Sequence, residues 1–261
     1  MNPTATLPIL NIAGYRFVPL DGLPALRQRL WQAALAEDLK GTLLLAEEGI
    51  NLCLAGTEAG VKTWLAALRS DARFAELAVK PSWSASQPFQ RLKVKIKAEI
   101  IRMNQPGVVH EARPAAGRAP AVTAHSLARW IDQGHDDTGR PIKLLDTRNA
   151  FEVDAGAFEG AVDWRLQKFS DFPAALAVHR AELAGHTVVS YCTGGIRCEK
   201  AALLMQGLGL AHSYQLEGGI LKYFEDTQGR APGWRGECFV FDERAGLDTA
   251  LLPPPLRATP C

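Results

Sequence analysis

The sequence predicts an α/β protein of two domains, and three observations support this fold class. The chain has 261 residues, which is long enough for two domains that each bury a core. Strand and helix patterns lie on both sides of a segment at 107–120 that is rich in proline, glycine and alanine. Before this segment the strand and helix patterns follow the order β-α-β-β-α-β, and after it strands alternate with helices. We therefore place a first domain at 7–103, a linker at 104–121, a second domain at 122–230 and a C-terminal extension at 231–261.

The first domain has the element order of a ferredoxin-like (acylphosphatase-like) α+β fold. Leucines at helical spacing follow Pro24 and stop before Gly41, which indicates a helix between these residues. Thr57 is a suitable N-cap for a second helix, because its side-chain oxygen can accept a backbone N–H. The predicted elements are a strand at 15–20, a helix at 24–40, strands at 42–46 and 51–55, the helix after Thr57, and strands at 77–80 and 91–101. Their β-α-β-β-α-β order is that of a split βαβ unit.

The last strand of this domain carries a row of basic side chains that alternate with apolar ones. Alternation along a strand puts the basic side chains on one face. Such a row can neutralise phosphates of a nucleic acid without reading its sequence. It can equally be a solvated face whose lysines prevent edge-to-edge pairing of sheets. Both interpretations stay open for the four basic residues of this row, which are Arg91, Lys93, Lys95 and Lys97.

The second domain alternates strands with helices, which predicts a doubly wound parallel sheet covered on both faces. Its predicted elements are a helix that Thr123 caps, a strand at 142–145, a helix at 172–183, a strand at 186–191, a helix at 199–208 and a strand at 214–216. Ligands of such sheets bind at the carboxyl ends of the strands. Asp146, Cys192 and Glu217 all fall at these ends, so we expect one active-site rim there.

Cys192 is the residue with the strongest indication of chemistry. It lies between a buried strand pattern and a helix pattern, where a thiol meets unpaired N–H groups and the positive end of the helix dipole. Both favour the thiolate, so its pKa should fall below the ordinary value of about 8.5. Arg197 adds a positive charge across the loop and is the second candidate catalytic residue. The alternative is a buried, inert cysteine. The residues of the predicted active-site loop are Thr193, Gly194, Gly195 and Ile196.

The length of this loop helps to choose between two chemistries. Phosphatases with a cysteine nucleophile have five residues between the cysteine and the arginine, whereas four lie between Cys192 and Arg197. A tighter loop suits a sulfur atom or another small group on Cys192 better than a tetrahedral phosphate. Cys198 is a candidate resolving cysteine that would form a disulfide with Cys192, although it can equally pack under the loop.

Composition excludes several classes of protein. The formal net charge is +1, which neither requires nor excludes a nucleic-acid partner. No run approaches the roughly 18 apolar residues of a membrane span, and the N-terminus does not look like a signal peptide. The five cysteines are irregularly spaced and no His pair stands at ligand spacing, so we expect no metal site. Cysteine usage favours the reducing cytoplasm.

The second domain resembles the rhodaneses in several ordered motifs. This resemblance implies that Cys192 can carry sulfur as a persulfide. Asp146 and Arg148 would support the strand end and the active-site loop through charge-assisted hydrogen bonds. Ala157 stands where rhodaneses usually have histidine. The motifs are Asp146-Thr147-Arg148, Glu152, residues 156–161, residues 192–197 and Leu216-Glu217-Gly218-Gly219.

Four stretches of the sequence, at residues 46–51, 91–95, 191–201 and 238–244, form a more specific pattern. Through them the whole chain resembles a narrower family, the tRNA uridine hydroxylases (the YceA/TrhO family). The resemblance implies hydroxylation of the wobble uridine in the tRNA anticodon loop to 5-hydroxyuridine, with molecular oxygen as co-substrate and Cys192 as the required residue. No cofactor is evident from the sequence. Many members also carry a cysteine-rich tail, whereas this sequence ends with a lone Cys261. The resemblance also implies that the basic row of Arg91, Lys93, Lys95 and Lys97 contacts tRNA.

Two other functions remain as alternatives. A sulfurtransferase would cycle Cys192 through a persulfide taken from thiosulfate or from a sulfur donor protein, and the loop suits this chemistry equally well. The first domain with its basic strand favours hydroxylation of tRNA, because transfer of sulfur between small molecules does not need it. A binding module without catalysis is the second alternative, and the intact Cys, Gly-Gly and Arg pattern of the loop argues against it.

Overall fold

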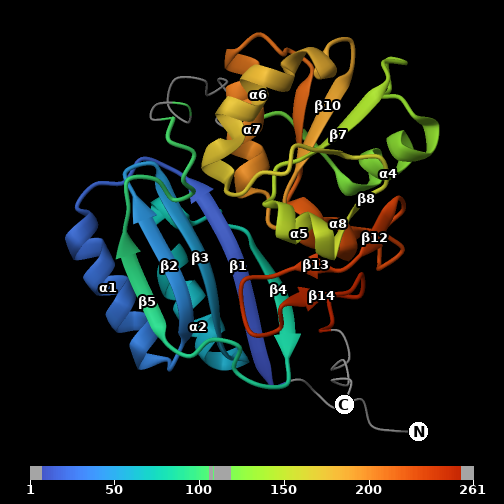
Figure 1. Ribbon diagram of the computed structural model, residues 1–261. Coiled ribbons are helices and arrows are strands. Elements are labelled where there is room, and N and C mark those ends of the chain that lie inside the picture. The colour runs from blue at the N-terminus through green and yellow to red at the C-terminus, as the bar shows by residue number, and fades with distance from the viewer. Residues whose placement is uncertain (1–7, 106–107, 109–118, 254–261) are drawn as a thin grey trace, which may run out of the picture. The chain divides into compact units, whose positions relative to one another are not determined.

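A computed structural model describes residues 8–105, 108 and 119–253 (Figure 1). The chain forms two compact units, of which unit 1 contains residues 1–100 and 241–245 and unit 2 contains residues 101–240 and 246–261. Most of the linker predicted at 104–121 lies outside the described residues. Met103, placed at the end of the first domain from the sequence, packs in a core of unit 2 instead.

Unit 1 is a five-stranded sheet with the strand order β4-β1-β3-β2-β5. The first four strands have the antiparallel ferredoxin-like arrangement, which confirms the predicted fold. β5 is an additional edge strand that pairs in parallel with β2. The buried residues of both helices and of the sheet form one core. The elements are β1 (Ile9–Phe17), α1 (Leu23–Ala36), β2 (Lys40–Ala46), β3 (Gly49–Thr57), α2 (Glu58–Arg69), β4 (Val79–Ser84) and β5 (Leu92–Ile96).

Unit 2 is built on a five-stranded parallel sheet with the order β6-β11-β10-β7-β9. One core joins the sheet to α4 and α8, and another joins it to α6 and α7. Helices thus cover both faces, which confirms the doubly wound prediction. The strands are β6 (Ala121–Val122), β7 (Ile142–Asp146), β9 (Val162–Asp163), β10 (Thr187–Tyr191) and β11 (Ser213–Leu216). The helices are α4 (Ala124–Gln133), α5 (Ala150–Ala155), α6 (Phe172–His179), α7 (Ile196–Gly207) and α8 (Gly219–Asp226).

Some element boundaries differ from the sequence predictions. β1 begins at Ile9 and not at residue 15, because it pairs with β3 along its whole length. α7 begins at Ile196, three residues earlier than predicted. The short elements α5 and α8 were missed, as were two pairs of small strands. These strands are β8 (Gly156–Phe158) with β12 (Trp234–Gly236), and β13 (Cys238–Phe239) with β14 (Gly246–Leu247).

The C-terminal extension contributes to both units. Its residues 241–245 belong to unit 1, where the guanidinium of Arg244 donates to Ser82 Oγ at 2.7 Å and pairs with Asp242.

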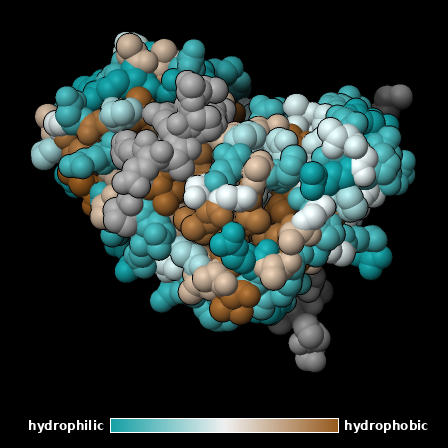
Figure 2. All heavy atoms as spheres, turned by 90° about the horizontal axis from the view of Figure 1, so that it is seen from above, coloured by the Kyte–Doolittle hydropathy of each residue, from teal (hydrophilic) through white to brown (hydrophobic). Residues whose placement is uncertain are grey.

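Hydrophilic residues cover most of the face that Figure 2 shows. Within the described residues, no helix is both long and apolar enough to cross a membrane.

Candidate active site

Cys192 follows the last residue of β10, and its side chain is fully buried. β10 is buried along its whole length, as its adjacent valines and its tyrosine predict. Only Thr193, Gly194 and Gly195 separate Cys192 from the start of α7. Gly195 has a φ of 99°, a left-handed conformation that glycine adopts without steric cost. This turn lets the Gly195 N–H donate to the sulfur of Cys192 at 3.1 Å.

The amino end of α8 holds the other side of the loop. The N–H groups of Ile220 and Leu221 donate to the carbonyl oxygens of Cys192 and Thr193 at 3.0 and 3.2 Å. Gly219 makes this approach possible, because a Cβ there would collide with Cys192 O and lie 2.6 Å from Gly195 N. The predicted Glu217-Gly218-Gly219 motif therefore contributes backbone to the site. The two loop carbonyls are bound to α8, while the Gly195 N–H is directed to the sulfur.

Arg197 lies in the first turn of α7 and forms a buried ion pair with Glu152 of α5. Its two terminal nitrogens donate to the two carboxylate oxygens at 2.6 and 2.7 Å. Glu152 Oε2 also accepts the N–H of Asn149 at 3.1 Å, which fixes the carboxylate at the start of its own helix. Glu152 was not among the predicted site residues. The Asn149-x-x-Glu152 pattern, which is typical of a capping box at the start of a helix, could have indicated from the sequence that Glu152 begins a helix here.

Asp146 and Arg148 form a second buried ion pair at the end of β7. The guanidinium of Arg148 donates to both oxygens of Asp146, with a shortest distance of 2.6 Å, and neither side chain is exposed. The same guanidinium donates to the carbonyl oxygens of Glu152 and Gly156 at 3.2 and 2.6 Å. Arg148 thus ties β7 to both ends of α5. This geometry suits the supporting role expected from the sequence.

The environment of Cys192 favours its thiolate form. Burial opposes ionisation most strongly, but three effects outweigh it: the hydrogen bond with Cys198, the charge of Arg197 and the backbone N–H groups of Cys198 and Arg197. Together they lower the pKa of Cys192 from 9.0 to about 5. The sequence predicted this direction. Burial and the neighbouring Cys192 instead raise the pKa of Cys198 well above its ordinary value, so Cys198 keeps its proton.

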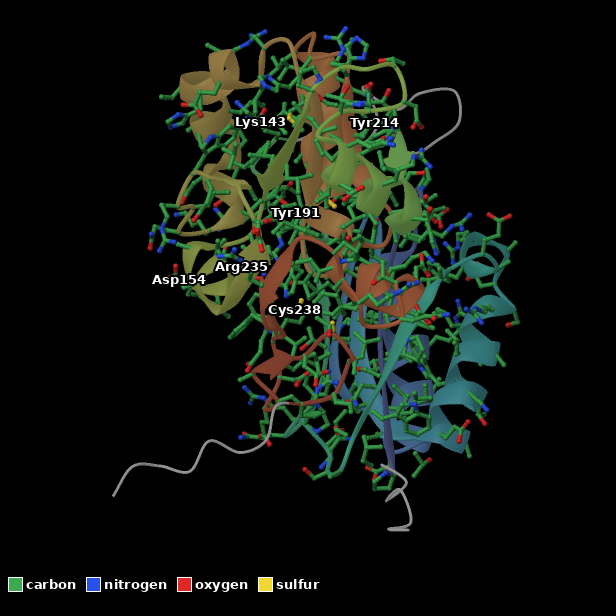
Figure 3. All side chains as sticks on the ribbon, turned by 90° about the vertical axis from the view of Figure 1, so that its right-hand side faces the viewer. Lys143, Asp154, Tyr191, Tyr214, Arg235 and Cys238 are labelled. Atoms are coloured by element: carbon green, nitrogen blue, oxygen red, sulfur yellow. The ribbon has the colours of Figure 1, made fainter. Side chains whose placement is uncertain are left out.

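A further thiol near the loop was not expected to belong to the site. Cys238 on β13 is fully buried, and burial raises its pKa to about 12. The neighbouring Phe239 carbonyl lies 3.4 Å from the Thr193 hydroxyl, so this strand borders the active-site loop. Figure 3 shows Cys238 and Tyr191 inside the unit, and Asp154 and Arg235 at its margin. The short strand and its distance along the chain hid this neighbour from the sequence analysis.

The candidate tRNA-binding residues lie on β5 and next to it, in unit 1. Arg91, Lys95 and Lys97 are exposed, and Lys93 is half-buried. On the apolar face of the same strand, Val94 is buried while Ile96 is 40% exposed. β5 is an edge strand, so the geometry is compatible both with phosphate contacts and with protection of the edge. The described residues contain no group of three or more side chains suited to holding a metal ion.

The sheet, the loop and the buried ion pairs define unit 2 as a rhodanese domain. Residues 123–226 match the family description "Rhodanese-like domain". Residues 9–100 match the "UPF0176 acylphosphatase like domain". The chain is therefore a rhodanese-domain protein with an acylphosphatase-like N-terminal domain.

Relatives that match along most of their own length make the assignment more specific. A protein of Bordetella avium named tRNA uridine(34) hydroxylase is 60% identical, over 94% of this chain and 99% of its own length. Relatives of the same name from Variovorax paradoxus and Bordetella pertussis are 60% and 56% identical, over 92% and 94% of this chain and 89% and 98% of theirs. The chain belongs to the tRNA uridine(34) hydroxylase family.

Proposed function

We propose that this protein hydroxylates carbon 5 of the wobble uridine in the tRNA anticodon loop, using molecular oxygen as co-substrate. The name shared by its relatives supports the substrate, since the identity extends over 94% of the chain. The observation that carries the proposal is the position of Cys192 between β10 and α7, where the Gly195 N–H lies 3.1 Å from its sulfur. This environment lowers the pKa of the thiol to about 5 and favours the thiolate. A thiolate is a strong nucleophile, and uridine carries an electrophilic carbon next to the position that becomes hydroxylated.

In the mechanism that we propose, the thiolate of Cys192 adds to carbon 6 of the uridine. The addition turns carbon 5 into an enolate-like nucleophile that can react with oxygen. The Gly195 N–H lies 3.1 Å from the sulfur and stabilises the thiolate before addition and after release. Arg197 contributes positive charge, and its ion pair with Glu152 fixes where that charge lies. We therefore assign Arg197 to stabilising the thiolate.

The proposal also specifies how tRNA would be held. A base in the anticodon loop is partly unstacked, so its extrusion into an active site costs little free energy. The exposed side chains of Lys95 and Lys97 suit the phosphate backbone, and they carry no information about sequence. A tRNA substrate would place the protein in the cytoplasm.

The test is nucleoside mass spectrometry of tRNA from a deletion strain that carries the gene. We expect the intact protein to restore 5-hydroxyuridine and the Cys192→Ser variant to restore none. Cys53→Ser is a matched control, because Cys53 is an exposed cysteine of unit 1. If the Cys192→Ser variant restores full hydroxylation, the proposed role of the thiolate is wrong. Rapid transfer of sulfur from thiosulfate to cyanide, with no restoration of 5-hydroxyuridine, would favour the sulfurtransferase instead.

A further inference from the structure

Two cysteines of unit 2 lie in contact and have opposite tendencies to ionise. The sulfurs of Cys192 and Cys198 are 3.9 Å apart, and both side chains are fully buried. A disulfide needs a separation of about 2.05 Å, so the two sulfurs are within about 2 Å of bonding distance. Cys198 lies in the first turn of α7, and its sulfur is 3.1 Å from the Gly195 carbonyl oxygen. Both sulfurs therefore contact the same glycine of the loop.

The proposed reaction has a requirement that such a pair satisfies. When oxygen converts uridine to 5-hydroxyuridine, one oxygen atom enters the carbon–hydrogen bond and the other must leave as water. Formation of that water consumes two electrons and two protons beyond those of the uridine. Oxidation of two thiols to one disulfide releases two electrons and two protons. The stoichiometries match.

We propose that Cys192 and Cys198 together are the reductant of the hydroxylation, and that each turnover leaves a disulfide between them. This inference rests on the proposed function and adds the source of its electrons. Cys198 thereby becomes a second residue that takes part in the chemistry.

The steps balance in atoms and electrons. The Cys192 thiolate bonds to carbon 6, and carbon 5 gives its electron pair to oxygen. The outer oxygen of the resulting peroxide takes up a proton, which gives a hydroperoxide on carbon 5 of the uridine. The thiol of Cys198 accepts the outer oxygen, so that the oxygen–oxygen bond breaks, the uridine keeps a hydroxyl and Cys198 becomes a sulfenic acid. Loss of the proton on carbon 5 breaks the sulfur–carbon bond and releases 5-hydroxyuridine. The freed Cys192 thiolate then attacks the sulfur of Cys198, and the sulfenic hydroxyl leaves as water with a proton.

The structure favours Cys198 over Cys238 as the second thiol. The sulfur of Cys198 contacts the sulfur of Cys192. The sulfur of Cys238 instead contacts a carbonyl oxygen, that of its neighbour Phe239, at 3.8 Å. The control for loss of a thiol is Cys53, an exposed cysteine of unit 1.

The experiment uses the full-length protein, reduced without oxygen, freed of reductant and mixed with tRNA that lacks the modification. Oxygen is then admitted, and 5-hydroxyuridine and the 192–198 disulfide are measured by mass spectrometry. We expect one 5-hydroxyuridine per chain, an equal amount of disulfide, and no further turnover until a dithiol is added. Without tRNA, the disulfide should form at least tenfold more slowly.

The variants separate this inference from the proposed function. Cys198→Ser and Cys198→Ala should each yield less than a tenth of the first-turnover product, and an added dithiol should restore turnover. Cys53→Ser, at an exposed cysteine of unit 1, should behave as the unchanged protein does. Repeated turnover without any reductant, or a full equivalent from both Cys198 variants, would overturn the inference while leaving the hydroxylase intact. No product from the unchanged protein even with dithiol present would instead overturn the proposed function.

Discussion

Replacing Cys192 with serine should remove a pH-dependent part of the free energy of unfolding. The folded protein lowers the pKa of this thiol from 9.0 to about 5, so between these values the unfolded chain binds one more proton than the folded one. Stability from this source is fully present above pH 9 and is lost as the pH falls through 5. Its slope is about 1.4 kcal/mol per pH unit, which amounts to about 3 kcal/mol at pH 7.

The assay is urea unfolding of the unchanged protein and of Cys192→Ser at pH 5, 6, 7 and 8. The difference in unfolding free energy between them should grow steadily with pH. Cys238→Ser is the control, because the pKa of Cys238 is raised to about 12 and that thiol stays protonated over this range in the folded protein. Its difference from the unchanged protein should stay constant up to pH 8. A Cys192→Ser difference that is flat from pH 5 to 8 would refute the thiolate assignment.

Three further changes test other parts of the site. Glu152→Gln breaks a buried ion pair and should lower the unfolding free energy by about 3–5 kcal/mol in urea unfolding, whereas Glu159→Gln, in an exposed pair, should cost less than about 1 kcal/mol. Gly219→Ala should distort the active-site loop and raise the pKa of the Cys192 thiol, which the absorbance of the thiolate measures. Gly209→Ala is its control, because Gly209 has a similar φ but no atom near the added Cβ, and it should leave the pKa of Cys192 unchanged. Replacing Lys93, Lys95 and Lys97 with glutamine should weaken the salt dependence of tRNA binding. The slope of log K against log salt concentration should become shallower by about 0.7 for each phosphate that the protein no longer neutralises. An unchanged salt slope would favour protection of the sheet edge.

The central part of the site could be predicted from the sequence because it is local. A buried strand, two glycines and a helix follow one another within about twenty residues, and this order alone places Cys192 at the amino end of α7. The lowered pKa follows from the same order. The two-domain division and both fold types were also predicted, since strand and helix periodicities extend over whole elements.

The rest of the site depends on contacts between distant parts of the chain. Glu152 precedes its partner Arg197 by 45 positions, and its helix of six residues is too short to show a periodic pattern. Cys238 comes to the loop on a strand of two residues that its pairing with β14 defines. The role of Gly219 rests on the close approach of α8 to the loop, which a glycine in the sequence permits but does not specify.

Residues 241–245 have a practical consequence for any attempt to study the halves separately. Because this stretch belongs to unit 1 although it lies near the other end of the chain, no single cut yields two whole domains. A fragment that stops at residue 100 lacks the hydrogen bond between Arg244 and Ser82, and one that begins at 101 carries five residues without their proper partners. Dissection would need a circularly permuted gene or a peptide of these residues supplied in trans.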